Sequence, residues 1–165
     1  MTRVLVAGVG NIFKGDDGFG VEVVQRLARG DLPAGVRVVD FGIRGVDLTY
    51  ALLDGCEAAV LVDTAQRGGA PGDLYVIEPE FDDRAPAPED LMISGHDLDP
   101  AKVLRVVRAM GGACRRILLV ACEPLTFGGE DGAMGLSPPV AAAIATAQGL
   151  VEDVVRQLLQ VEAVP

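Results

Sequence analysis

Short apolar runs recur along the chain, each bounded by glycine, proline or charged residues. Val, Ile and Leu dominate these runs, and some are almost continuously apolar, which is typical of strands covered by helices on both faces. The pattern predicts strands at 3–9, 36–41, 57–65, 72–78 and 115–123. Segments with helical periodicity lie between and after them, at 20–29, 46–54, 99–110 and 138–160.

Strand and helix alternate along most of the chain, so we predict an α/β fold. Its three layers are an open, mainly parallel, twisted sheet with helices on both faces. Ligands of such sheets bind beyond the carboxyl ends of the strands. If the strands are parallel, four loops share that rim: 8–18, 40–45, 63–69 and 122–135. No repeat or second unit interrupts the pattern, so we expect one domain over 1–165, with a short tail from about 161.

The composition narrows the classes of function. The chain has 24 acidic and 14 basic side chains, a net charge of -10, which disfavours a nucleic-acid partner. No apolar run approaches the length of a membrane span and the start does not resemble a signal peptide, so we expect a cytoplasmic protein with no membrane partner. The cysteines lack CxxC spacing, which favours buried free thiols; they are Cys56, Cys114 and Cys122.

A glycine-rich loop, GNIFKGDDGFG, follows the first predicted strand. A phosphate site is disfavoured there, because Phe13 replaces the third glycine of the dinucleotide fingerprint and Lys14 precedes a glycine instead of following one. We expect Asp16 to cap the next helix. Asp17 is then left to present a carboxylate at the rim, while Ser137 and Pro138 indicate the start of the last helix.

Two further residues have chemistry suited to a site. Asp63 ends a buried apolar run, and His96 is the only histidine. Together with Asp17 they form a set able to bind a divalent transition metal, although each also fits a capping or turn role. Two other interpretations stay open: Asp17 and Asp63 sharing a proton, and Cys122 acting as a nucleophile with His96.

The motifs together resemble those of hydrogenase maturation proteases, endopeptidases that trim the large subunit of nickel-iron hydrogenases. The resemblance covers residues 4 to about 159, and its motifs are VLVAGVGNIFKGDDGFG, VVDFGIRG, AVLVDTAQRGGAPGDL, SGHDLDPAKVL and GLSPPVAAAI. It implies a phosphorylase/hydrolase-like fold and an aspartic-type endopeptidase that removes a C-terminal extension. It also implies that Asp17, Asp63 and His96 contact nickel already inserted into the precursor, with no metal held permanently.

The catalytic assignment within this set is a hypothesis, in which Asp17 or Asp63 activates the attacking water. Where many family members have DGGTxG, this chain has DFGIRG, a loop expected to contact the substrate through Asp40, Gly42 and Gly45. Two alternatives to proteolysis remain: a nickel-binding maturation factor without protease activity and, less favoured, a nucleotide-binding α/β protein.

Overall fold

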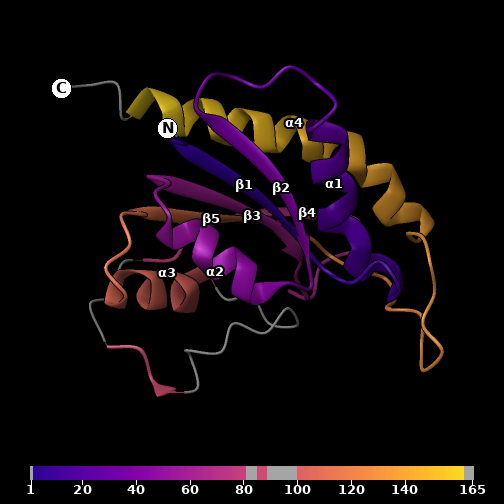
Figure 1. The fold of residues 1–165 in the computed structure, drawn as a ribbon. Coiled ribbons are helices and arrows are strands. Elements are labelled where there is room, and N and C mark those ends of the chain that lie inside the picture. The colour runs from indigo at the N-terminus through magenta and orange to yellow at the C-terminus, as the bar shows by residue number, and fades with distance from the viewer. Residues whose placement is uncertain (1, 81–84, 89–99, 162–165) are drawn as a thin grey trace.

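The computed structural model describes residues 2–80, 85–88 and 100–161, and the strands and helices alternate along them (Figure 1). Each predicted strand and helix is confirmed, with small shifts at the ends. In chain order they are β1 (Val4–Val9), α1 (Phe19–Leu27), β2 (Val36–Gly42), α2 (Gly45–Leu53), β3 (Ala58–Thr64), β4 (Leu74–Ile77), α3 (Pro100–Ala109), β5 (Arg116–Cys122) and α4 (Pro138–Val161). A short 3-10 helix, η1 (Gly15–Gly18), precedes α1.

The strands form one sheet in the order β2-β1-β3-β5-β4. Strands β2, β1, β3 and β5 are parallel, and β4 pairs antiparallel with β5 at the edge. The carboxyl ends of the four parallel strands therefore meet at the same edge of the sheet. This arrangement confirms that the four predicted loops share one rim.

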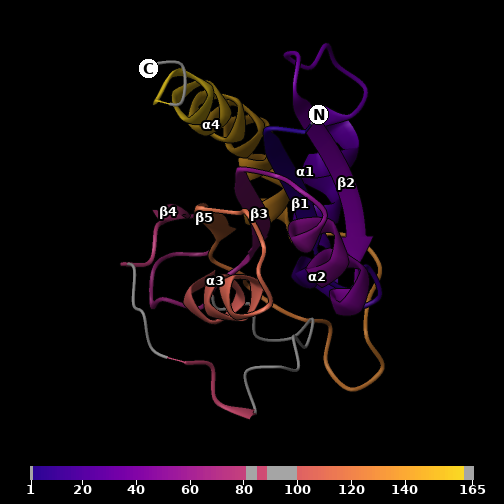
Figure 2. The ribbon, with the colours of Figure 1, turned by 60° about the vertical axis from the view of Figure 1, so that its left-hand side comes forward.

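Helices cover both faces of the sheet, as the alternation of buried side chains requires (Figure 2). On β1, Val4 and Val6 pack with α1 and α4, whereas Leu5 and Ala7 pack with α2 and α3. Helix and strand residues on each face bury a separate hydrophobic cluster. The predicted three-layer α/β fold is confirmed. The single-domain boundary at 1–165 stays a prediction.

Helix α1 lies unusually close to the sheet at Gly20. A Cβ at this position would lie 2.6 Å from the carbonyl oxygen of Val9 and closer still to that of Val62. Replacing Gly20 with alanine should therefore displace α1 and lower the free energy of unfolding by about 3 kcal/mol, measured by urea denaturation. Gly149→Ala in α4 is the matched control.

A Cβ at Gly149 meets nothing within 4 Å, so this variant causes no clash and only gains the higher helix propensity of alanine over glycine. It should be more stable by about 1 kcal/mol. If the two variants changed stability in the same direction, close packing at Gly20 would not be the reason for glycine there.

Within the part of the chain that the structure describes, no helix combines the length and the apolar character of a membrane span.

Candidate active site

Two rim loops that are distant in the sequence lie side by side, the loop after β1 and the loop between β5 and α4 (Figure 1). Gly15 donates its N–H to the carbonyl oxygen of Ala133 at 2.7 Å, and Ala133 donates to Phe13 at 3.0 Å. The N–H of Asp16 is held in the same way, by the carbonyl oxygen of Thr126 at 3.0 Å. The two loops thus form one hydrogen-bonded unit that carries Asp16 and Asp17.

The Asp16 side chain holds this unit together from inside. It is fully buried, with 0% of its surface exposed. Its carboxylate accepts hydrogen bonds from the N–H groups of Leu125 at 2.8 Å, Thr126 at 3.0 Å and Ser137 at 2.7 Å. The Ser137 hydroxyl also donates to it, at 2.8 Å. We call this arrangement the Asp16 clasp.

The prediction that Asp16 caps α1 is wrong. Neither η1 nor α1 has a side-chain cap hydrogen bond. The carboxylate points instead at the donors of the distant loop, which no local pattern indicates. Ser137 and Pro138 do mark the start of α4, because the Ser137 carbonyl oxygen accepts the N–H of Ala141 at 2.8 Å and Pro138 is the first helical residue.

The clasp keeps Asp16 ionised. Burial acts to raise the pKa of Asp16, but the hydrogen bonds from Ser137, Thr126 and Leu125 outweigh burial and hold the pKa below its usual value. Four donors around one carboxylate explain how a charge is accommodated in the interior.

Asp17 is half-buried and its side chain turns back over the loop after β1. Its Oδ2 accepts the N–H of Asn11 at 2.8 Å. Gly10, with a φ of +138°, lies directly against the backbone of Asp17, where a Cβ would collide with the Asp17 carbonyl oxygen. Glycine at position 10 therefore lets the loop close around Asp17.

Asp63 lies at the carboxyl end of β3, and only 7% of its surface is exposed. Burial raises the pKa of Asp63 well above its usual range, and the negative charge of Asp17 raises the pKa further. The Thr64 N–H, which donates to Oδ1 at 2.7 Å, acts in the opposite direction and lowers the pKa. The structure thus brings Asp17 and Asp63 close enough for one charge to act on the other. His96 lies outside the described residues, so its place in the set stays a prediction.

Sequence reasoning missed Glu123, a third buried carboxylate on the rim, 6% exposed and directly after β5. It accepts the N–H of Arg67 at 2.8 Å, that of Gly68 at 3.1 Å and the hydroxyl of Tyr75 at 3.0 Å. The Arg67 hydrogen bond is the main reason that the pKa of Glu123 is lowered, against the effect of burial. Glu123 thereby holds the loop that follows Asp63. The sequence feature that could have indicated Glu123 is its position at the carboxyl end of a predicted strand, where ligands of such sheets bind.

The residues predicted to contact the substrate lie at the carboxyl end of β2. The Asp40 carboxylate accepts a hydrogen bond from Gln25 Nε2 at 3.2 Å. Gly42 has a φ of +55°, and its carbonyl oxygen accepts the N–H of Gly10 at 2.9 Å, while Gly45 begins α2. This end of β2 is thus joined to the loop that carries Asp17. The substrate-binding role of the three residues stays a prediction.

Cys122 is poorly suited to act as a nucleophile. It is fully buried at the end of β5, and burial raises the pKa of its thiol to about 11, with the charge of Asp16 adding to the rise. The nucleophilic thiolate is therefore scarce near neutral pH. The prediction of buried free thiols is confirmed for all three cysteines.

A complete metal site is not visible in the described part of the chain. Among residues 2–80, 85–88 and 100–161, no three His, Cys, Asp or Glu side chains gather closely enough to hold a metal ion. Asp17 and Asp63 supply two carboxylates and no nitrogen or sulfur ligand, an incomplete set for a divalent transition metal.

Comparisons with known proteins identify the same family as the motifs. A family model described as hydrogenase maturation protease matches residues 21–154. The hydrogenase 2 maturation protease of Escherichia coli is 32% identical over 166 residues, covering 99% of this chain and 96% of that protein. The hydrogenase expression/formation protein HupD of Rhodobacter capsulatus is 35% identical over 158 residues, covering 94% of this chain and 71% of its own length.

Solved structures are similar over the same range. The hydrogenase maturating endopeptidase HybD from Escherichia coli superposes with a TM-score of 0.74 at 28% identity, covering 94% of this chain and 93% of that one. A solution structure of an endopeptidase from Escherichia coli gives 0.75 at 30% identity, with the same coverage. The protein with this rim of buried carboxylates belongs to the hydrogenase maturation protease family.

Proposed function

We propose that this protein is an aspartic-type endopeptidase that removes the C-terminal extension of a nickel-iron hydrogenase large-subunit precursor after nickel insertion. The observation that carries the proposal is the pair of carboxyl groups on the rim. Asp63 is buried and its pKa is raised, partly by the charge of Asp17. Such a pair is suited to acid–base chemistry near neutral pH.

In this mechanism Asp63 accepts a proton from the attacking water and returns it to the leaving amine. The raised pKa of Asp63 makes this group a stronger base than an ordinary carboxylate, which favours its taking the proton from water. Asp17 is fixed by the Asn11 N–H and orients the substrate or its metal. Because Asp17 and Asp63 are an incomplete ligand set, the nickel arrives as part of the precursor, with His96 as the third predicted contact.

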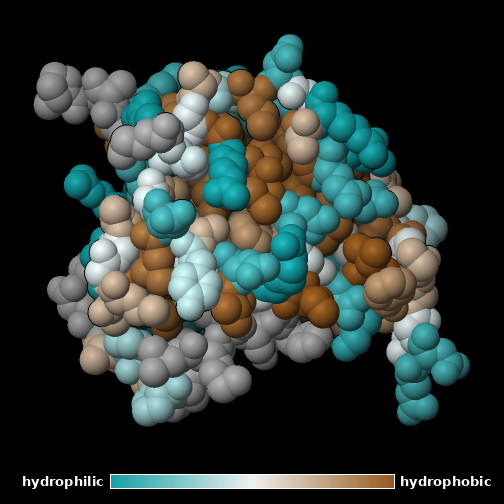
Figure 3. Space-filling view, viewed as in Figure 1, coloured by the Kyte–Doolittle hydropathy of each residue, from teal (hydrophilic) through white to brown (hydrophobic). Residues whose placement is uncertain are grey.

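Exposed apolar side chains on the rim are further evidence that the substrate is a protein. They stand on the loop after β1, on the segment from the end of β2 into α2, and on the loop after β5. They are Ile12, Phe13, Ile43, Val46, Tyr50, Leu125, Phe127 and Met134. Figure 3 shows a group of hydrophobic side chains near the middle of the right-hand side of the molecule, with hydrophilic ones above and below, and the first and last of these loops lie on that side. Large exposed apolar groups that gather on one edge are typical of protein-binding surfaces.

The proposal is tested by incubating the purified protein with precursor in nickel-loaded and nickel-free form and measuring the mass of the large subunit. The nickel-loaded precursor should be shortened at its C-terminus, and the nickel-free precursor should stay intact, because it lacks the metal that Asp17 and Asp63 contact. Asp17→Asn should abolish the shortening. Asp153→Asn, which changes an exposed carboxylate on α4, is the matched control and should retain it.

Equal cleavage of both precursors would contradict the metal-dependent step, and no cleavage of either would contradict the protease assignment. Tight nickel binding by the isolated protein without cleavage would favour the non-proteolytic maturation factor instead.

A further inference from the structure

Two of the three buried cysteines lie at the amino ends of adjacent parallel strands, far from the rim. Cys56 precedes β3 and Cys114 precedes β5, each two residues before the paired positions Ala58 and Arg116. The two chain segments remain side by side at the cysteines, because the Arg115 N–H donates to the Glu57 carbonyl oxygen at 2.8 Å. Adjacent strands are separated by about 4.8 Å, which lies within the Cα separation of about 4.4–6.8 Å found in disulfides.

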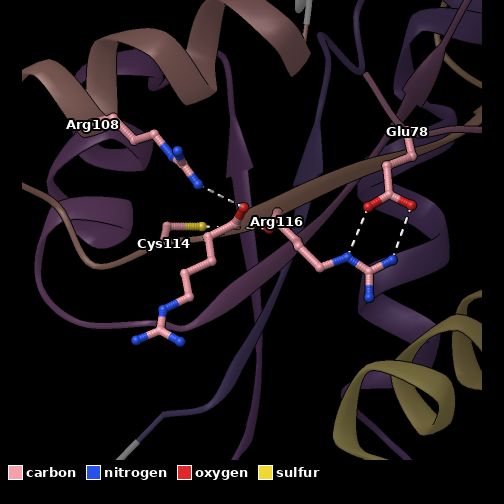
Figure 4. A network of polar contacts seen from close by, with 5 residues as sticks. Glu78, Arg108, Cys114 and Arg116 are labelled. Carbon is pink, nitrogen blue, oxygen red and sulfur yellow. Dashed lines mark hydrogen bonds and ion pairs between the residues drawn. The ribbon is translucent and has the colours of Figure 1, made fainter. Parts of the chain in front are cut away.

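The two thiols lie close enough to interact. A hydrogen bond between the side chains lowers the pKa of Cys56 and raises that of Cys114, as expected if Cys114 donates to the Cys56 sulfur. Cys114 Sγ also reaches the carbonyl oxygen of Arg116 at 3.5 Å, and the Arg108 guanidinium lies beside it, hydrogen-bonded to the Arg115 carbonyl oxygen (Figure 4). Cys56 is therefore the sulfur more able to react as a thiolate.

Both thiols are buried, but Cys114 lies directly between exposed residues. Cys56 is 2% and Cys114 is 1% exposed, yet the residues on either side of Cys114, Ala113 and Arg115, are exposed. A small local opening therefore suffices to admit a small oxidant. A larger reagent needs a larger opening.

We propose that Cys56 and Cys114 form a peroxide-sensitive thiol pair that closes to an intramolecular disulfide. The Cys56 thiolate attacks one oxygen of hydrogen peroxide, forming a sulfenic acid, and the hydroxide released takes up the proton that Cys56 lost. The Cys114 sulfur then attacks the sulfenic sulfur, its own proton leaves with the displaced hydroxyl as water, and the S–S bond forms. In total, two thiols and one peroxide give one disulfide and two waters.

This inference does not depend on the proteolytic activity. The disulfide would join the amino ends of β3 and β5, whereas Asp63 and Glu123 lie at their carboxyl ends. It would close a long loop of the unfolded chain, between residues 56 and 114, so the oxidised protein should unfold at a temperature higher by roughly 10 °C.

The test is to treat the full chain with hydrogen peroxide, alkylate it under denaturing conditions and map the peptides by mass spectrometry. The native protein and Cys122→Ala should lose two hydrogen atoms and yield a linked peptide of Cys56 with Cys114. Cys56→Ala and Cys114→Ala should yield no internal disulfide, and neither should show the rise in melting temperature. The same treatment in urea should give mixed pairings, which would show that the native fold selects this pair.

A native protein in which all three cysteines remain alkylatable, or in which Cys122 is linked to either of the others, would overturn the proposal. The Cys122→Ala variant keeps the test decisive if a variant of the pair fails to fold.

Discussion

Replacing Asp16 with alanine should lower the free energy of unfolding by about 4 kcal/mol. The substitution leaves the N–H groups of Leu125, Thr126 and Ser137 and the Ser137 hydroxyl without their buried acceptor. It also removes the side-chain hydrogen bonds between the two rim loops and leaves only the backbone ones, so cleavage of the precursor should fall as well. Urea denaturation followed by circular dichroism measures the first effect.

Two variants distinguish the contribution of the Asp16 clasp to stability from that of other hydrogen bonds on the rim. Ser137→Ala removes only the hydroxyl hydrogen bond and should cost about 1 kcal/mol. Asp17→Ala loses a single acceptor of the Asn11 N–H on a half-buried residue and should cost a similar amount. If Asp16→Ala were no less stable than Asp17→Ala, the four hydrogen bonds would not hold the loops together.

The pH dependence of the Asp16 effect has a definite sign. Because the pKa of Asp16 is lowered in the folded state, its stabilising contribution is complete above the unfolded pKa of about 3.9. It is lost as the pH falls through the folded value. The difference in stability between the native protein and Asp16→Ala should therefore be constant near neutral pH and shrink below about pH 4.

Asp63→Asn should reduce cleavage of the nickel-loaded precursor by about 10³-fold, because the amide can neither accept nor return a proton. The same variant should be more stable than the native protein at neutral pH, by about 1 kcal/mol. The neutral side chain avoids the cost of ionising a buried acid beside Asp17. Single-turnover cleavage and urea denaturation of the same preparation measure the two effects.

The sign of the stability effect follows from the raised pKa of Asp63. Below the unfolded pKa both states are protonated, so Asp63 imposes no cost there. As the pH rises above about 3.9 the unfolded state ionises first, and the folded state loses relative stability until the pH passes the folded pKa. The gain of Asp63→Asn should therefore grow from about pH 4 upward. Full activity with no gain in stability would exclude Asp63 as the acid–base group.

The strands and helices could be predicted because their signals are local. Strand β3 is buried from Ala58 to Asp63 and appears in the sequence as an apolar run, and α4 begins at Pro138 as its proline indicates. The parallel arrangement follows from the alternation of the two elements. That alternation places Asp63 and the loop of Asp17 on one rim before any coordinates are known.

The roles of Asp16 and Glu123 could not be predicted, because their partners are remote in the sequence. Asp16 accepts hydrogen bonds from residues 109 to 121 positions away, and Glu123 from Arg67, 56 positions away. The pattern around Asp16 is that of a helix cap, and the actual donors appear only when two loops meet. Interactions that depend on tertiary contact leave no local pattern to read.

The Asp16 clasp also separates the part of the β5–α4 loop that must keep its length from the part that need not. Asp16 binds Leu125 and Thr126 at one end and Ser137 at the other, and the backbone of Ala133 is hydrogen-bonded to Phe13 and Gly15, so the segment 127–132 leaves and returns at a fixed base. A long surface insertion closed at its base costs little additional entropy. Segments of other lengths could therefore be exchanged at 127–132 while Asp17 and Asp63 keep their positions, which makes this segment a suitable place to re-engineer the choice of hydrogenase.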